Sequence, residues 1–79
     1  MDYYVYALRS LKDGRLYIGF SKNPQERLRQ HNDGMCRSTR NRRPFRLIYS
    51  ELCGPRVEAR RKEIWLKSGA GHSFLKAFG

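Results

Sequence analysis

The sequence predicts a mixed α/β (α+β) domain in which helices flank a small three-stranded antiparallel sheet. Two short runs rich in aromatic and β-branched residues lie on either side of the turn residues Asp13 and Gly14, a pattern typical of a β-hairpin. Helix start signals follow the hairpin, and a third apolar run and a longer helical segment come later. The expected order is two strands, a helix, a short helix or ordered loop, a third strand and two helices.

The turn decides how the first two strands pair. The expected strands cover residues 3–8, 16–20 and 45–52. If Asp13 and Gly14 form a two-residue turn, Tyr6 lies about 13 Å from Tyr17 along the hairpin. If the turn is centred one residue earlier, Tyr6 faces Gly19, and the two tyrosines share one face about 7 Å apart. An odd slip would put them on opposite faces.

The first helix has clear terminal signals. Asn23 is a good N-cap residue, Pro24 fits the first helical position and Glu26 can complete a capping box. These signals predict a helix from Pro24 to about Asn32. Residues 35–43 are polar and basic, and suit either a short helix or an ordered loop.

The second half of the chain reads as a long helix followed by a shorter one. The long helix is expected over residues 55–68, where residues 69–71 (Gly-Ala-Gly) stop it. Val57, Ile64 and Trp65 recur at helical spacing and are expected to be its core residues. Residues 72–78 are expected to form a last helical turn or two against the core.

Composition limits the class of protein. Seventeen Lys and Arg residues stand against seven Asp and Glu residues, and the formal net charge is +10. Most of the cations are arginine, which suits bidentate phosphate contact. The excess predicts a nucleic-acid partner, with a merely solvated basic surface as the alternative. The 79 residues suffice for one domain.

The expected cellular location rests on two signals that the sequence lacks. No apolar run is long enough to cross a membrane, and the first residues have no basic signal-peptide region, so a cytoplasmic protein is expected. Cys36 and Cys53 lack CxxC spacing. They are expected to be free thiols in a reducing compartment, with a single disulfide as the alternative.

Several short motifs follow one another in a fixed order. They are YVY at 4–6, LYIG at 16–19, NPQERLRQHN at 23–32, Thr39, RRPFRLIY at 42–49 and EARRKEIWLKSG at 58–69. In this order and spacing the chain resembles single-domain members of the GIY-YIG nuclease family, and the incision module of bacterial excision-repair nuclease. Tyr4 stands where the family name has glycine, and no asparagine follows Asn41.

The resemblance implies a metal-dependent endonuclease that hydrolyses phosphodiester bonds in DNA, with a role in DNA repair as one expectation. Tyr6 and Tyr17 would lie near the nucleophilic water and orient or deprotonate it. Arg27 would contact the scissile phosphate, with His31 beside the site. Glu63 would bind one divalent metal ion, Mg²⁺ or Mn²⁺.

Elementary chemistry agrees with these roles. One metal ion can neutralise charge and acidify a bound water. Arg27 and His31 are four residues apart on one helix face. A phenol titrates near ~10, so a tyrosine base needs a nearby cation to lower its pKa. The alternatives are that Tyr6 and Tyr17 fill the core and that Glu63 is a surface carboxylate paired with another residue, Lys67.

A set of basic residues and one threonine is expected to contact the DNA backbone without sequence specificity. The substrate is expected to be DNA, including branched or single-stranded forms. One active site in a monomer or weak dimer should nick one strand, and a protein partner could supply specificity. A catalytically silent nucleic-acid-binding module is the competing hypothesis, and a small basic interaction protein on RNA is the third. The expected contacts are Lys22, Arg37, Thr39, Arg40, Arg42, Arg43, Arg60, Arg61 and Lys67.

Overall fold

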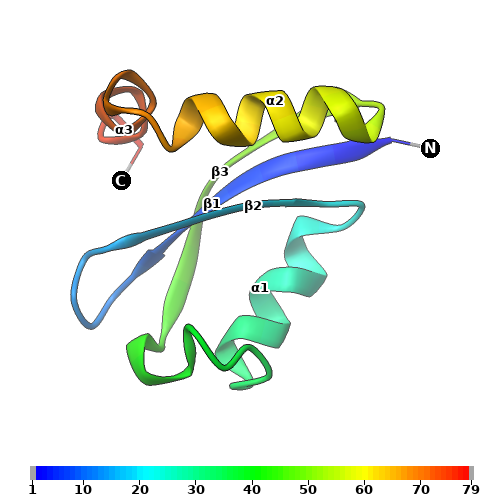
Figure 1. Ribbon diagram of the computed structural model, residues 1–79. Helices are drawn as coiled ribbons and strands as arrows, with labels where there is room; N and C mark the ends of the chain where they lie inside the picture. The colour runs from blue at the N-terminus through cyan, green and yellow to red at the C-terminus, as the bar shows by residue number, and fades with distance from the viewer. Residues whose placement is uncertain (1, 79) are drawn as a thin grey trace.

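The computed structural model describes residues 2–78, which form an antiparallel sheet in the order β2-β1-β3 with helices on both faces (Figure 1). The α+β class and the element order predicted from the sequence are confirmed. The elements are β1 (Tyr3–Ser10), β2 (Leu16–Ser21), α1 (Pro24–Asn32), the 3₁₀ helix η1 (Arg40–Arg42), β3 (Phe45–Gly54), α2 (Arg56–Leu66) and α3 (Gly69–Leu75).

The β1–β2 hairpin has the register that brings the tyrosines together. Tyr6 pairs with Gly19, and Leu8 pairs with Tyr17. The connection is closed by a hydrogen bond from Ser10 N to Arg15 O of 2.9 Å. The turn is therefore centred one residue before the Asp13–Gly14 pair, as the shared-site hypothesis required.

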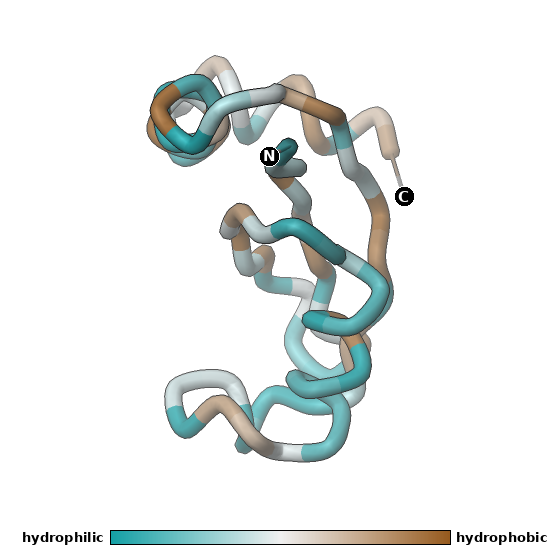
Figure 2. Tube along the Cα trace, turned by 90° about the vertical axis from the view of Figure 1, so that its right-hand side faces the viewer, coloured by the Kyte–Doolittle hydropathy of each residue, from teal (hydrophilic) through white to brown (hydrophobic). Residues whose placement is uncertain are grey.

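The two faces of the sheet carry separate apolar clusters because side chains alternate along each strand. On one face Val5, Ala7 and Ile18 pack with residues of α2 and α3. On the other face Tyr6 and Leu8 pack toward α1. Figure 1 shows α2 and α3 above the sheet and α1 below it. The part of the molecule below the sheet, around the end of α1, is mostly hydrophilic in Figure 2.

Helix α1 begins and ends at the residues that the sequence predicts. The Asn23 side chain accepts a hydrogen bond from Glu26 N at 3.2 Å. The Glu26 carboxylate binds Arg29, so the reciprocal bond of a capping box is not made. At the other end the Asn32 amide accepts from Phe45 N at 2.7 Å and donates to Phe45 O at 3.0 Å, which fixes β3 to the end of α1.

Helix α2 ends at Leu66, close to the predicted end at about Ser68, but residues 69–71 are not a stop signal: they begin α3, which the sequence predicts only from residue 72. The Ser68 hydroxyl caps this helix by accepting from Gly71 N at 3.2 Å. A Cβ on Gly71 would lie 2.3 Å from both Leu66 Cα and Trp65 O. The glycines therefore permit a close approach of α3 to the end of α2 and do not end a helix there.

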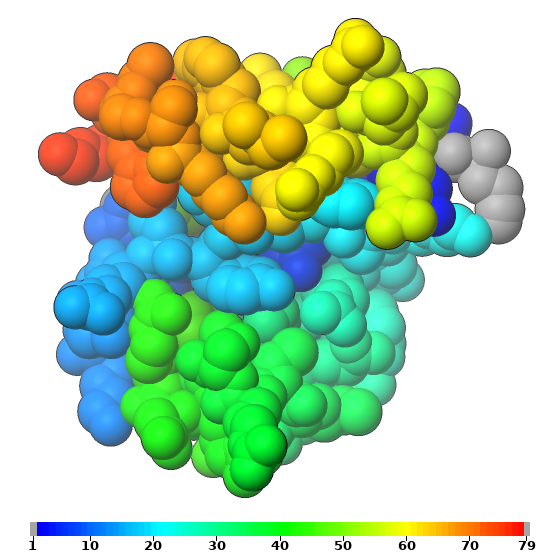
Figure 3. Space-filling model, in the orientation of Figure 1, coloured from blue at the N-terminus to red at the C-terminus, as the bar shows by residue number. Residues whose placement is uncertain are grey.

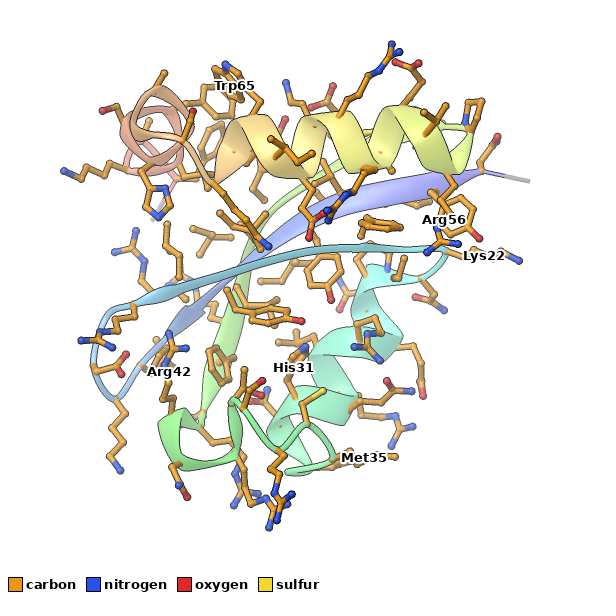
Figure 4. All side chains as sticks on the ribbon, in the orientation of Figure 1. Lys22, His31, Met35, Arg42, Arg56 and Trp65 are labelled. Atoms are coloured by element: carbon orange, nitrogen blue, oxygen red, sulfur yellow. The ribbon has the colours of Figure 1, made fainter. Side chains whose placement is uncertain are left out.

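The predicted core face of α2 is also wrong. Val57, Ile64 and Trp65 are 56%, 55% and 42% exposed, and Trp65 projects from α2 away from the sheet in Figure 4. The buried residues of α2 are Ala59, Leu66 and the charged Glu63. No helix within residues 2–78 is long and apolar enough to cross a membrane. Both cysteines are free thiols.

Candidate active site

Two tyrosines lie next to each other on the face of the sheet that α1 covers. The Tyr6 and Tyr17 ring centroids are 6.4 Å apart. Tyr6 is buried and Tyr17 is half-buried. A Cβ on Gly19 would lie 2.8 Å from the Tyr6 hydroxyl oxygen and 3.4 Å from Tyr17 Cε2. Gly19 therefore leaves the space that the Tyr6 hydroxyl occupies, beneath the backbone of the edge strand β2.

Arg27 approaches the tyrosine pair from α1. Its guanidinium interacts with the Tyr6 hydroxyl, and this interaction raises the pKa of Arg27. It also donates to Gln30 Oε1 at 2.7 Å and contacts Cys36 Sγ at 3.9 Å. Arg27 is half-buried, and no carboxylate among the described residues pairs with it. A fixed, charged and uncompensated guanidinium is suited to an anionic ligand.

His31 lies one helical turn after Arg27 and points from α1 toward the sheet (Figure 4). Its ring is buried, and its centroid is 4.5 Å from that of Tyr17. Nδ1 is 2.8 Å from the Thr39 hydroxyl, which itself donates to Cys36 O at 3.3 Å. With the Thr39 hydrogen directed at Cys36 O, the matching tautomer of His31 has its proton on Nδ1 and donates a hydrogen bond to Thr39 Oγ1. Nε2 faces Cys36 Sγ at 3.9 Å.

Two pKa shifts describe the electrostatics of this cluster. Burial raises the pKa of Tyr6, and the hydrogen bond and charge of Arg27 oppose this only in part. Burial and the charge of Arg27 lower the pKa of His31. Near neutral pH, Tyr6 is a neutral phenol and His31 a neutral imidazole, so Arg27 is the cation of the cluster.

Glu63 lies on the other face of the sheet, on the inward side of α2. It is 6% exposed. Its Oε1 accepts from Arg60 at 2.8 Å and its Oε2 pairs with Lys67 at 3.2 Å. Within residues 2–78 no group of three or more His, Cys, Asp or Glu side chains could bind a metal ion. One carboxylate still fits Mg²⁺, which keeps several waters and takes further ligands from substrate phosphate.

The edge strand β2 is where the two faces can act together. In the described sheet β2 pairs only with β1, so its outer side is open. Figure 3 shows β2 crossing the middle of one face of the molecule, between α2 above and α1 with the segment after it below. A strand of nucleic acid along this edge would have Glu63 on one side and the Tyr6–Tyr17–Arg27 group on the other.

The basic residues that the sequence assigned to phosphate contact have varied surroundings. Arg42 pairs with Asp13 at 3.3 Å, and Arg61 pairs with Glu58 at 3.2 Å. Arg60 and Lys67 pair with Glu63 as described. The Arg43 guanidinium donates to a carbonyl of η1, and Lys22 lies over the Tyr3 ring at 5.6 Å. Arg37 and Arg40 are exposed.

The sequence suggested a substrate contact for Thr39, but its side chain is 1% exposed and supports His31 from inside the fold. The sequence predicts no role for Cys36 beyond that of a free thiol, but its Sγ contacts both Arg27 and His31. Nothing in the sequence pattern identifies either contact, because both depend on the path of the loop after α1.

Residues 2–71 match the model of the GIY-YIG catalytic domain. The chain therefore belongs to the GIY-YIG family of nucleases. Membership implies a DNA substrate, and nucleases of this family generally use a divalent metal ion. Within that family it is similar to proteins named UPF0213. One, from Staphylococcus saprophyticus, is 35% identical over 75 residues, 94% of this chain and 90% of that protein. Another, from Bacillus licheniformis, is 41% identical over 67 residues, 84% of this chain and 68% of that protein.

The solution NMR structure of a UPF0213 protein from Bacillus halodurans has the same fold. It is 34% identical, with a TM-score of 0.58, over 98% of this chain and 84% of that one. The name UPF0213 states no activity.

Proposed function

We propose that this protein is a metal-dependent endonuclease that nicks one strand of DNA with low sequence specificity. The observation that supports it is the grouping of Tyr6, Tyr17 and Arg27 beside Gly19, at the open edge of the sheet. Two phenols beside a half-buried guanidinium without a counter-ion are unusual for a structural core, because a charge partly removed from water normally has one.

The two tyrosines have different environments and therefore different roles. Because the pKa of Tyr6 is raised, its hydroxyl keeps its proton at neutral pH and orients a water or a phosphate oxygen by hydrogen bonding. Tyr17 is half-buried and lies against the neutral ring of His31. It is the better placed of the two to contact the attacking water.

Arg27 supplies the fixed positive charge. Its guanidinium would bind the scissile phosphate and stabilise the charge that develops on its oxygens. His31 is a positioning residue, because its ring is buried beneath Tyr17 and bonded to Thr39. Its neutral ring keeps Tyr17 in place without adding a second charge near Arg27.

Glu63 would bind the divalent ion, Mg²⁺ or Mn²⁺, at the same edge of the sheet. When bound, such an ion neutralises phosphate charge and acidifies a coordinated water. In this chain Arg60 and Lys67 neutralise the nearly buried carboxylate, so one of them must release it when a cation binds. Both residues are exposed enough to turn toward a DNA phosphate.

Cleavage of defined DNA substrates tests the proposal. Purified protein is incubated with duplex, single-stranded and branched DNA, with and without Mg²⁺ or Mn²⁺. Glu63→Ala and Tyr17→Phe are compared with the matched controls Glu58→Ala, an exposed carboxylate on the same helix, and Tyr3→Phe. We expect metal-dependent nicking that both test variants lose and both controls keep. Binding without cutting of any substrate would leave only the silent binding module.

A further inference from the structure

A second basic site lies at the turn end of the β1–β2 hairpin, on the face of the sheet that α3 covers. It is a cavity of about 400 Å³ between the hairpin and α3. Three cationic side chains and one imidazole line it, and the described lining includes no carboxylate. The lining residues are Arg9, Gly14, Arg15, Leu16, His72 and Lys76.

Arg9 shows that the cavity is suited to an anion. Its side chain is half-buried, and its Nε is a buried donor without a hydrogen-bond partner. A buried donor left unsatisfied is costly, and most such groups in proteins have a partner. Arg9, Arg15 and Lys76 make no ion pair among the described residues. Nε has almost no solvent-accessible surface in this conformation. An anion in the cavity would therefore first relieve the repulsion among the three cations, and would bond Nε once the Arg9 side chain turns toward it.

We propose that this cavity binds a backbone phosphate of the DNA strand whose cleavage was proposed above, on which this inference rests. Arg9 pairs with Leu16 at the start of β2, and Gly19 lies three residues farther along the same edge. Three residues of strand span about 10 Å. In duplex DNA the phosphates of one strand advance about 3.4 Å per nucleotide along the helix axis, so in a duplex substrate the bound phosphate lies about three nucleotides from the scissile one.

None of the residues that line this cavity is among those that the sequence predicts to contact DNA. His72 and Lys76 follow the segment that matches the family, which ends at residue 71. Arg9 is on the opposite face of the sheet from Tyr6, because their positions on β1 differ by an odd number. The cavity thus extends the binding surface along the α2–α3 side of β2, where a bound strand would pass Glu63.

DNA binding without metal tests this site independently of cleavage. The affinity for a labelled single-stranded oligonucleotide is measured by fluorescence anisotropy at several salt concentrations without divalent ions. Lys76→Gln and Arg9→Gln are compared with Arg29→Gln, an exposed arginine already paired with Glu26 and Asp33. The logarithm of the association constant falls as the logarithm of the salt concentration rises. Each test variant should make the slope of this dependence less steep by about 0.7, the value for one phosphate contact in a single strand. Arg29→Gln should keep the wild-type slope.

Lys76 is exposed, so Lys76→Gln retains the fold even if Arg9→Gln does not. A wild-type slope in Lys76→Gln would overturn the proposal. Tight binding of inorganic phosphate at fixed ionic strength, with no change in the DNA slope, would also overturn it, because the site would then be one for free phosphate.

Cleavage adds a positional test. A neutral methylphosphonate linkage about three nucleotides from the cut, on one side of it, should slow the wild type and leave Lys76→Gln unaffected. Equal slowing of both proteins would contradict the placement of the phosphate. If the wild type cuts nothing, the nuclease proposal is wrong, and the binding slopes still decide whether the cavity holds a phosphate.

Discussion

Replacing Gly19 by alanine tests whether the space beneath β2 positions the Tyr6 hydroxyl. The new Cβ would lie 2.8 Å from Tyr6 Oη and 3.1 Å from Tyr6 Cζ, whereas ordinary contacts begin at 3.4 Å. The ring must therefore move by about 0.6 Å. Overpacking a core in this way costs about 1–3 kcal/mol. For a domain of this size, each kcal/mol lowers the melting temperature by about 4–8 °C.

The same shift should slow cleavage. A misplacement of about 1 Å can cost about a hundredfold in rate, so a shift near half that size should cost roughly tenfold. The melting temperature is followed by circular dichroism, and nicking is followed below the melting temperature of each variant, so that only folded protein is compared.

A second substitution separates the clash from a general loss of packing. Tyr6→Phe removes the oxygen that the alanine would meet, so Gly19→Ala should destabilise a Tyr6→Phe background less than the wild type. We expect a coupling free energy of about 1 kcal/mol from the double-mutant cycle. Simple additivity of the two substitutions, or an unchanged melting temperature in Gly19→Ala, would refute the reasoning.

Three further outcomes follow from contacts in the fold. Because burial and Arg27 lower the pKa of His31, the unfolded chain binds more protons than the folded one as pH falls below the ordinary histidine value of about 6.5. The melting temperature should therefore fall as the pH is lowered from about 7 to about 5, and it should fall less in His31→Gln. An equal fall of the melting temperature in the wild type and in His31→Gln would contradict a buried neutral ring. Gly71→Ala should destabilise the protein by more than about 3 kcal/mol in urea unfolding, because the new Cβ would lie 2.3 Å from backbone atoms. The control Gly69→Ala should be neutral or stabilising, because its Cβ would have no atom within 4 Å. Asn32→Ala should cost about 1–3 kcal/mol by the same measurement, because it leaves the backbone of Phe45 without its two amide bonds, and a neutral effect would show that water replaces them.

Local signals in the sequence explain why much of the fold could be predicted. The Asn23–Pro24 pair sets the start of α1, because capping and proline geometry act within one turn. The aromatic and β-branched runs predict the strands because successive side chains of a strand point to opposite faces of the sheet, and helices cover both faces. Glycines near the end of α2 were misleading, since glycine also permits close helix packing. Only the position of Gly71 against Leu66 distinguishes the two uses.

The candidate site could be predicted only in part. The grouping of Tyr6, Tyr17 and Arg27 follows from register and helix face, and the sequence constrains both. The face on which Glu63 lies depends on how α2 rotates against the sheet. That rotation is set by Ala59 and Leu66 rather than by the larger apolar residues of the helix. The partners of His31 come from a loop, whose path has no periodic signal.

The open edge of β2 also bears on how copies of this protein meet. A strand with one unpaired side can pair with another chain, and natural proteins oppose this with charge at the edge. Two copies meeting here would each bring a formal charge of +10, which repels strongly at low salt and weakly once ions screen it over about 10 Å. Variants that remove several arginines at once would weaken DNA binding and this protection against aggregation together. Loss of cutting in such a variant is therefore interpretable only once the variant has been shown not to aggregate.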